Sequence, residues 1–575
     1  MNESQSARAG GHSRSIPIGS AIANRPWLLA ALGGVALIAS AAVASSQVTA
    51  RPAHTTERRA HVPTSGEIRA ENALEVAKHF GAPGLYAFLN PFPKGADLHM
   101  HLSGAIYAET FIAEAAKQGL CVAAVDPGKP PDPIGQDAVQ FVPAPCGKGA
   151  VPIANALSNQ ALYDNLVDSF SMRAFVPTEG IDGHDQFFST FARFGGMKDV
   201  AGEWLDEVAT RAAAQNEQYL EIMQTPTFSN AAKLGAQIGW PGGSEASVTD
   251  ETLATLRDKL LAAGLRSEVS VDEKEFADAQ IARRGIEHCA QASAAGEAPA
   301  CRVRIHFLYQ VLRGYPPQQV FAQALLGFEV ASADPDVVGI NFVMPEDGRI
   351  AMQDYHLQMQ MLDYLHGVYP KVHISLHAGE LAPGMVPPAG LSFHIREAVE
   401  LGHAERIGHG VDVLYEDRPY DLLKEMAAKH IDVEINLTSN DGILGIKGTD
   451  HPLSAYRAAH VPFSLSTDDE GVSRIDLTHE YVRAVTEQNL SYMDLKLSAR
   501  DSLEHSFLPG ESLWVHPDNF TLMKPACAGQ AGTTSPTADC AALLKSSEKA
   551  AEEWELERRL AAFEDSAPQP LRMVP

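Results

Sequence analysis

Short apolar segments typical of β-strands recur eight times along this chain, and amphipathic helical stretches separate them. The segments span residues 96–101, 219–225, 303–311, 337–344, 372–377, 405–409, 432–437 and 461–467. Strands that alternate with helices favour a parallel sheet, and eight repeats favour an α/β fold in which the sheet closes into a (β/α)8 TIM-type barrel. At 575 residues and 45% hydrophobic content the chain exceeds the ~250 residues typical of that fold, so we expect loop insertions.

Several of these segments end in side chains that bind metal ions. His99 and His101 lie two apart on the first segment, so both side chains point to the same face of a strand. His377 and Asp468 lie at the ends of two later segments, and they complete the set of nitrogen and oxygen ligands that a zinc ion requires. Because catalytic groups of such barrels gather at the C-terminal ends of the strands, we expect one site there.

Four motifs, in the order ADLHMHLSG, SLHAGE, RIGHGVD and STDDE, resemble those of the adenosine deaminase family of the amidohydrolase superfamily. The resemblance runs from about Gly95 to Leu508 and implies a barrel that holds one zinc ion and converts adenosine or 2′-deoxyadenosine to the 6-oxo purine and ammonia. By position it implies metal ligands at His99, His101, His377 and Asp468, proton-handling groups at Glu380 and His409, and a contact to the purine or the attacking hydroxide at Asp469.

The chemistry of deamination agrees with the roles of the last two motifs. Zinc supplies a nucleophile by lowering the pKa of bound water to about 7. Glu380 lies three residues after His377, and a desolvated carboxyl with a raised pKa can protonate the ring nitrogen beside the reacting carbon. His409 lies between Gly408 and Gly410, which allow close backbone approach, and it can orient the hydroxide and stabilise the developing oxyanion.

Each motif alone has a plainer interpretation, because an Asp-Asp pair is common in turns, HAGE can begin a helix and GHG can be a loop. Their joint position at strand ends favours the catalytic interpretation. A two-metal hydrolase of another bond is one alternative, but VVGINFVMPED lacks the lysine that bridges two metals in such enzymes. A secreted binding protein on the same scaffold, without catalysis, is the other alternative.

Departures from the family pattern concern the substrate, and they include Asn436 and Leu437 at the usual Cys-Pro positions. Ser103 stands where the family usually carries an acidic residue that reaches the sugar 5′-hydroxyl, and Met344 replaces a glycine whose backbone N–H contacts the purine, so that the larger residue could narrow the pocket. Asn341 replaces an aspartate. Substrate binding is therefore expected to involve Asp469, Ser103 and Met344, and adenine or an N6-substituted adenosine is the alternative substrate.

The charge of the protein limits its partners. A formal net charge of −27 argues against binding DNA or an acidic membrane surface, because phosphate neutralisation requires clustered Lys and Arg. We therefore expect a small, uncharged purine nucleoside as the ligand, with no nucleic-acid partner.

The N-terminus predicts export. Three arginines precede the apolar run WLLAALGGVALIASAAVA, which ends in an A-x-A site at Ala42 to Ala44, as in a secretory signal peptide. The run is also just long enough to span a bilayer, so an uncleaved anchor is the alternative. Either way, the enzyme is expected in the periplasm or outside the cell.

Six cysteines suggest the same compartment, because an oxidising environment permits three disulfides. Sequence separation favours nearest-neighbour pairs, although fifteen pairings are possible and buried free thiols are the alternative. The favoured pairs are Cys121 with Cys146, Cys289 with Cys301, and Cys527 with Cys540.

The expected organisation has four parts. They are a signal peptide or anchor (1–50), a helical lead-in (51–90), the deaminase barrel (91–510) and a C-terminal extension (511–575) with a helix packed through Trp554 and Leu556. A stripe of phenylalanines at helical spacing follows the first strand and predicts core packing, with a hydrophobic lid over the substrate as the lesser hypothesis. The stripe comprises Phe187, Phe188, Phe191 and Phe194.

Overall fold

A computed structural model describes most of the residues from 62 onward. The described residues are 62–124, 138–178, 180–198, 200–241, 248–289, 298–517, 519–533 and 535–566. They belong to one structural unit, residues 60–575. The predicted signal segment, residues 1–50, lies outside the described residues.

Eight parallel strands form the central sheet, in the same order as in the sequence. They are β1 (Gly95–His101), β5 (Glu217–Gln224), β6 (Arg304–Leu312), β7 (Val337–Val343), β8 (His373–Ala378), β9 (Arg406–His409), β10 (Asp432–Ile435) and β11 (Phe463–Leu465). The last strand returns to the first, because the His101 N–H donates to the Asp468 carbonyl at 3.3 Å and the Asp468 N–H donates to the His99 carbonyl at 2.8 Å. The predicted (β/α)8 barrel is confirmed, and each predicted strand segment overlaps an observed strand.

The strands are buried because helices surround the barrel. Leu308, Ile340, Leu376, Ile407 and Val433 are all buried. The helices at or around the barrel are α6 (Ala201–Ala214), α7 (Ser229–Ile238), α8 (Asp250–Ala262), α9 (Arg266–Ile286), α10 (Pro317–Ala333), α11 (Arg349–Gln353), α12 (Tyr355–Val368), α13 (His394–Glu400), α14 (Pro419–Lys429), α15 (Leu437–Leu444), α16 (Leu453–Ala459), α17 (Glu470–Ser473), α18 (Leu477–Glu487) and α19 (Tyr492–Glu504).

An insertion separates β1 from β5. It contains α3 (Ala108–Lys117), α4 (Gln160–Ser169), α5 (Gly183–Phe194) and an antiparallel sheet of β2 (Cys121–Ala124), β3 (Val139–Val142) and β4 (Val151–Pro152). Phe187 and Phe194 of α5 are buried, and Phe188 and Phe191 pack against the same core, so the predicted core packing of this stripe is confirmed.

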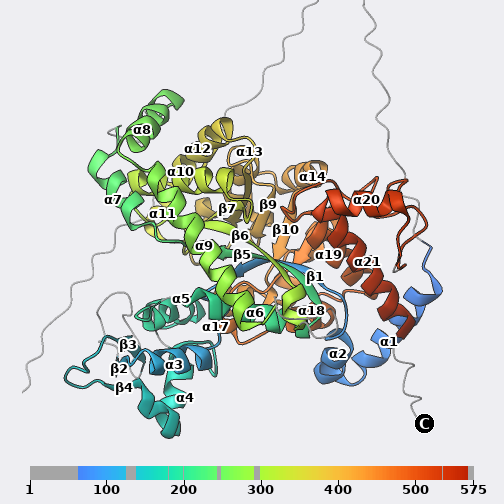
Figure 1. The fold of residues 1–575 in the computed structure, drawn as a ribbon, viewed down its shortest axis with the longest axis horizontal. Helices are drawn as coiled ribbons and strands as arrows, with labels where there is room; N and C mark the ends of the chain where they lie inside the picture. Colours follow the sequence, from blue (N-terminus) through green and yellow to red (C-terminus); the bar gives the residue numbers. More distant parts are fainter. Residues whose placement is uncertain are drawn as a thin grey trace, which may run out of the picture. The chain divides into compact units, whose positions relative to one another are not determined.

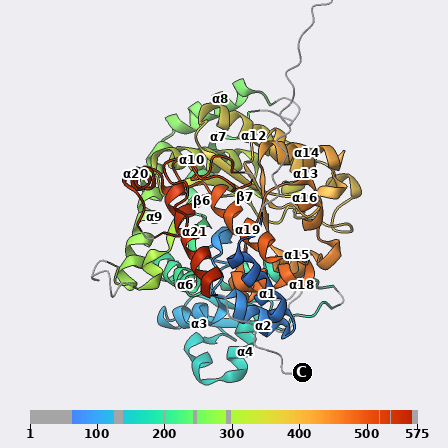
Figure 2. The ribbon, with the colours of Figure 1, turned by 90° about the vertical axis from the view of Figure 1, so that its right-hand side faces the viewer.

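The first and last described helices meet at the N-terminal end of the barrel. Figure 1 shows α1 (Ser65–Lys78) and α2 (Gly81–Leu89) beside α21 (Glu548–Ser566), which follows α20 (Ala538–Ser546). Glu552 of α21 accepts hydrogen bonds from Gln218 and Arg304 at the starts of β5 and β6. Trp554 and Leu556 are buried, as predicted. Figure 2 shows α21 next to α19 from a second side, in agreement with their contacts.

All three nearest-neighbour disulfides are present: Cys121–Cys146, Cys289–Cys301 and Cys527–Cys540. None of the helices in the described ranges combines the length and the apolar character that a bilayer crossing demands.

Candidate active site

The predicted ligands come together at the C-terminal end of the barrel. His99 and His101 lie at the end of β1, His377 lies near the end of β8, and Asp468 follows β11. The His101 Nε2 atom lies 3.2 Å from His377 Nε2 and 3.3 Å from Asp468 Oδ1, and His99 Nε2 lies 3.5 Å from the same oxygen. Four side chains from three distant parts of the sequence therefore face one point.

These separations fit a metal ion. Ligands at 2.0–2.2 Å from a tetrahedral zinc ion lie about 3.3 Å from one another. The buried His99 Nε2 atom has no hydrogen-bond partner among the described residues, which is costly unless another group satisfies it. The donor set of three imidazoles and one carboxylate is one that binds zinc in proteins.

Each of the three histidines uses its other ring nitrogen for a contact within the barrel. The Nδ1 atoms of His99, His101 and His377 lie 2.6 Å from Glu434, 2.8 Å from Gln310 and 2.7 Å from Asn341, respectively. Hydrogen bonds of this kind set the tautomer and the ring orientation of metal-binding histidines. All three rings therefore present Nε2 to the common point.

A buried charge network supports the His99 ring. Glu434 on β10 accepts a hydrogen bond from Arg406 on β9 at 2.6 Å, and Arg406 also forms an ion pair with Glu221 on β5 at 2.7 Å. Burial alone raises the pKa of Glu434, but Arg406 and His99 lower it to about 2. Glu434 is therefore ionised and holds His99 Nδ1 as the donor.

The predicted ligand Asp468 is also held by a hydrogen bond to the carboxylate oxygen that faces away from the other ligands. Its Oδ2 atom accepts a hydrogen bond from Ser439 at 2.7 Å. Burial alone raises the pKa of this carboxyl, but hydrogen bonds with His101 and His99 bring it well below its usual range. Burial and the neighbouring histidines lower the pKa of His377 well below 6.5. A carboxylate and a neutral imidazole are the forms that bind metals.

Glu380 lies beside this point with the properties of an acid. Its side chain is buried, and burial together with Asp468 and Glu346 raises its pKa well above 4.5. The loop that carries it is held by Glu346, whose carboxylate accepts hydrogen bonds from the Gly379 N–H at 3.0 Å and the Glu380 N–H at 2.7 Å. Glu346 in turn lies 2.5 Å from His394 Nδ1. Burial and the neighbouring carboxylates therefore favour the protonated form of Glu380.

His409 faces Glu380 at the end of β9. The distance between His409 Nε2 and Glu380 Oε1 is 3.7 Å. The preceding Gly408 allows the His99 ring to approach, since a Cβ atom at residue 408 would lie 2.5 Å from His99 Cε1. His409 itself has a φ of 71°, in the left-handed region, and such backbone strain is concentrated at functional sites.

The predicted substrate contacts lie around the same end of the barrel. The Asp469 carboxylate is buried against Gly104, where a Cβ atom would lie 1.4 Å from its Oδ1 atom. Ser103 is partly exposed just after β1. Met344 follows β7 with a φ of 102°, and its sulfur accepts a hydrogen bond from the Gly314 N–H at 3.2 Å. Met344 thus keeps a backbone conformation that favours glycine.

Helix α5 also reaches this end of the barrel. Its first turn contacts the segment after β7, where His184 Nε2 lies 3.1 Å from Asp347 Oδ1, and the helix packs on α15, which follows β10. Asp347 also contributes to the raised pKa of Glu380. The lid over the substrate stays a hypothesis.

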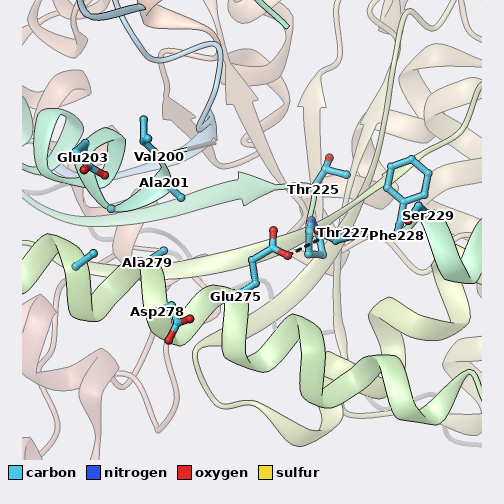
Figure 3. A pocket seen from close by; sticks show the side chains of 13 residues that line it. Val200, Ala201, Glu203, Thr225, Thr227, Phe228, Ser229, Glu275, Asp278 and Ala279 are labelled. Carbon is cyan, nitrogen blue, oxygen red and sulfur yellow. Dashed lines mark hydrogen bonds between the residues drawn. The ribbon is translucent and has the colours of Figure 1, made fainter. Parts of the chain in front are cut away.

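A separate cavity of about 650 Å³ lies between α6, α9 and the start of α7 (Figure 3). Thr225 to Ser229 line it after β5, and Glu275 accepts a hydrogen bond from the Thr227 N–H at 3.2 Å across it. Its titratable lining residues are Glu203, Glu275 and Asp278. None of the predicted site residues lines this cavity, so the candidate chemistry lies elsewhere.

Comparison with known sequences agrees with this geometry. A family model described as Adenosine deaminase matches residues 199–513, more than half of the chain. The chain belongs to the adenosine deaminase family. The match begins after β1, so His99 and His101 lie upstream of the matched residues and are placed in the site by the barrel itself.

Curated relatives within this family match a shorter stretch. The chain is 34% identical to an adenosine deaminase of Clostridium perfringens over 139 residues, and 38% identical to one of Escherichia coli (strain SE11) over 140 residues. Each match covers 24% of this chain and 39% of the relative. Among solved structures, an N6-mAMP deaminase of Arabidopsis aligns with a TM-score of 0.44 at 19% identity, over 74% of this chain and 96% of that chain.

Sequence reasoning did not identify the residues that support the ligands. Gln310, Asn341 and Glu434 are polar side chains within barrel strands, and this is the signal that could have revealed them, because a polar side chain inside a barrel needs a partner. Ser439 lies in α15, whose sequence LTSN carries no comparable signal by itself.

Proposed function

We propose that this protein is a zinc-dependent aminohydrolase that converts adenosine or 2′-deoxyadenosine, with water, to the corresponding inosine and ammonia. The observation that carries the proposal is the position of Glu380, a buried carboxyl with a raised pKa, beside the point where His99, His101, His377 and Asp468 converge. Family membership and the 34–38% identity to adenosine deaminases over their matched stretches support the reaction and the purine class.

Zinc held by these four ligands would lower the pKa of a water molecule so that its oxygen can attack the purine ring. Glu380 supplies a proton to the ring nitrogen beside the reacting carbon, which makes that carbon electrophilic. His409 faces the same space and stabilises the oxygen as it adds to the ring. Asp469, buried beside Asp468, would accept a hydrogen bond from the substrate.

The alternative substrate within the same reaction is adenine or an N6-substituted adenosine. One observation favours adenine, which has no sugar: the position after β1 that would meet the sugar carries the short, uncharged Ser103. A serine hydroxyl forms a weaker hydrogen bond to a ribose hydroxyl than a carboxylate does.

A substrate panel tests the proposal. The full-length protein, loaded with zinc, is incubated with adenosine, 2′-deoxyadenosine, adenine, AMP and N6-methyladenosine, and released ammonia or methylamine is measured. We expect ammonia from adenosine and 2′-deoxyadenosine. If ammonia or methylamine is released only from adenine or N6-methyladenosine, the alternative substrate is the correct one. Purine binding without release would favour a non-catalytic binding protein.

We further propose that the protein is exported to the periplasm or beyond. Three disulfides in the described residues support this, because disulfides persist in oxidising compartments. The test is expression of the full-length protein in a bacterium, followed by cell fractionation and mass mapping of peptides without reductant. We expect three linked peptide pairs in the periplasmic or membrane fraction. Reduced cysteines in a cytoplasmic protein would contradict export.

A further inference from the structure

A chain of hydrogen bonds connects the backbone N–H of Leu453 to the ring of His409. The backbone N–H of Leu453 can only donate, and it lies 3.2 Å from His451 Nδ1. That nitrogen must therefore accept the bond and carry no proton.

Because Nδ1 of His451 accepts a hydrogen bond, the protonation of its other ring nitrogen, Nε2, follows. The ring is buried, and burial together with Arg483 lowers its pKa to about 3, so it is neutral at physiological pH. A neutral ring that accepts at Nδ1 carries its proton on Nε2. This Nε2–H donates to Asn440 Oδ1 at 3.1 Å.

The bond from His451 fixes the orientation of the Asn440 amide. Because Oδ1 faces His451, the NH2 group faces His409, and its Nδ2 lies 3.0 Å from His409 Nδ1. Asn436 Nδ2 lies 3.4 Å from the same atom. Amide nitrogens donate and do not accept, so His409 Nδ1 must be the acceptor.

We propose that Asn440 and His451 are positioning residues that hold neutral His409 in the tautomer with its proton on Nε2. This nitrogen lacks a hydrogen-bond partner within the described residues and faces Glu380 at 3.7 Å. The inference rests on the proposed function in one respect: it makes His409 a hydrogen-bond donor to the oxygen that adds to the purine, and leaves protonation of the ring to Glu380.

The direct test is neutron diffraction from crystals of the zinc-loaded, full-length protein exchanged into heavy water. We expect a deuteron on Nε2 of both His409 and His451, and the ND2 group of Asn440 directed at His409. A deuteron on His409 Nδ1 would overturn the proposal. This measurement needs neither a variant nor turnover, so it stays informative if no aminopurine releases ammonia and the proposed function fails.

Two substitutions test which residue sets the tautomer. A carboxylate at residue 440 can only accept, so Asn440→Asp should move the deuteron to His409 Nδ1 and remove the donor from the site. Asn436→Leu should leave it on Nε2. Retention on Nε2 in Asn440→Asp, or its transfer to Nδ1 in Asn436→Leu, would overturn the assignment to Asn440.

Kinetics provide the functional readout. Loss of one donor to a developing oxyanion lowers kcat by about 10²- to 10³-fold, and we expect Asn440→Asp to show this loss with little change in KM. Asn489→Asp makes the same substitution at an exposed position and should retain wild-type kcat. Wild-type kcat in Asn440→Asp with the deuteron on Nδ1 would show that the tautomer has no catalytic role.

Discussion

At the scale of single residues, the site depends on which nitrogen each histidine presents. Glu434, Gln310 and Asn341 contact the Nδ1 atoms of the three ligand histidines, so that all three Nε2 atoms face one point. Two of these acceptors are neutral. The amide of Asn341, which stands where the resemblance expects an aspartate, therefore accepts the hydrogen bond from His377 without adding a negative charge.

Loss of one such acceptor should weaken metal binding without removing a ligand. Asn341→Leu takes away the acceptor of the His377 N–H, and loss of such a contact typically lowers metal affinity about 10- to 100-fold. We expect this decrease in zinc competition with a chromophoric chelator. Asn155→Leu, at an exposed position, serves as the control. Equal zinc affinity in both variants would mean that Asn341 does not support His377.

If Glu380 is the acid, its substitution should lower the activity and leave the zinc content unchanged. Glu380→Gln keeps the shape of the residue but cannot supply a proton, so kcat for ammonia release should fall by about 10²- to 10⁴-fold. Zinc content, measured by atomic emission, should stay at one ion per protein molecule. Glu275→Gln makes the same change in the separate cavity and should retain activity. Loss of zinc from Glu380→Gln would instead make this carboxyl a metal ligand.

At the scale of elements, the two ends of the barrel have different tasks. The C-terminal ends of the strands carry the site, whereas α1, α2 and α21 close the opposite end. Phe563 of α21 packs against Phe88 and Phe92, with ring centroids 5.4 and 5.5 Å away. Lys496 of α19 bridges Glu67 of α1 and Glu564 of α21. These contacts indicate a structural role for the C-terminal helix.

A core substitution in α21 should therefore affect stability and leave catalysis intact. Leu560 is 1% exposed and belongs to the main hydrophobic core. Leu560→Ala should lower the free energy of unfolding by about 2–5 kcal/mol through lost burial and a cavity. Urea unfolding measures the loss, and kcat should be unchanged below the transition. Leu522→Ala, at a 51% exposed position, is the control. A fall in kcat would instead connect α21 to the site.

At the scale of the whole molecule, an acidic protein buries several carboxyl groups that prefer to be protonated. Burial is the largest cause in each case and raises the pKa to about 7. These groups are Asp272, Glu416, Asp432, Glu470 and Glu480. Between about pH 4 and pH 7 these five groups hold protons in the folded protein that they release in the unfolded polypeptide, so their contribution to stability falls as the pH rises through that window.

Asp432 offers a test of this pH dependence. Its Oδ2 atom accepts a hydrogen bond from Ser464 at 2.7 Å, and its Oδ1 atom is buried without a hydrogen-bond partner among the described residues. Asp432→Asn resembles the protonated form at every pH, so its unfolding temperature should decline less than that of the wild type between pH 4.5 and pH 7.5. Scanning calorimetry measures both slopes. Exposed Asp417→Asn is the control, and parallel slopes for Asp432→Asn and the wild type would contradict the role of this carboxyl.

The amino-acid sequence by itself determined the number and order of the barrel strands and the residues that meet at their ends. Both follow from short-range properties. Apolar runs define buried strands, alternation places His99 and His101 on one face, and parallel strands bring their C-terminal ends to one edge. The disulfide pairs were also predicted from short separations, but only the fold brought the Cα atoms of each pair to 4.7–5.5 Å and excluded the other pairings.

Only the tertiary structure decided the hydrogen-bond partners, the tautomers and the pKa values of these residues. The partners of His99, His101 and His377 come from β10, β6 and β7, and the proposed tautomer of His409 depends on Leu453, His451 and Asn440. The pKa of Glu380 likewise reflects burial and carboxylates from other loops. Hydrogen bonds and desolvation act over a few ångströms in space, between groups that are often hundreds of residues apart, so no local pattern in the sequence records them.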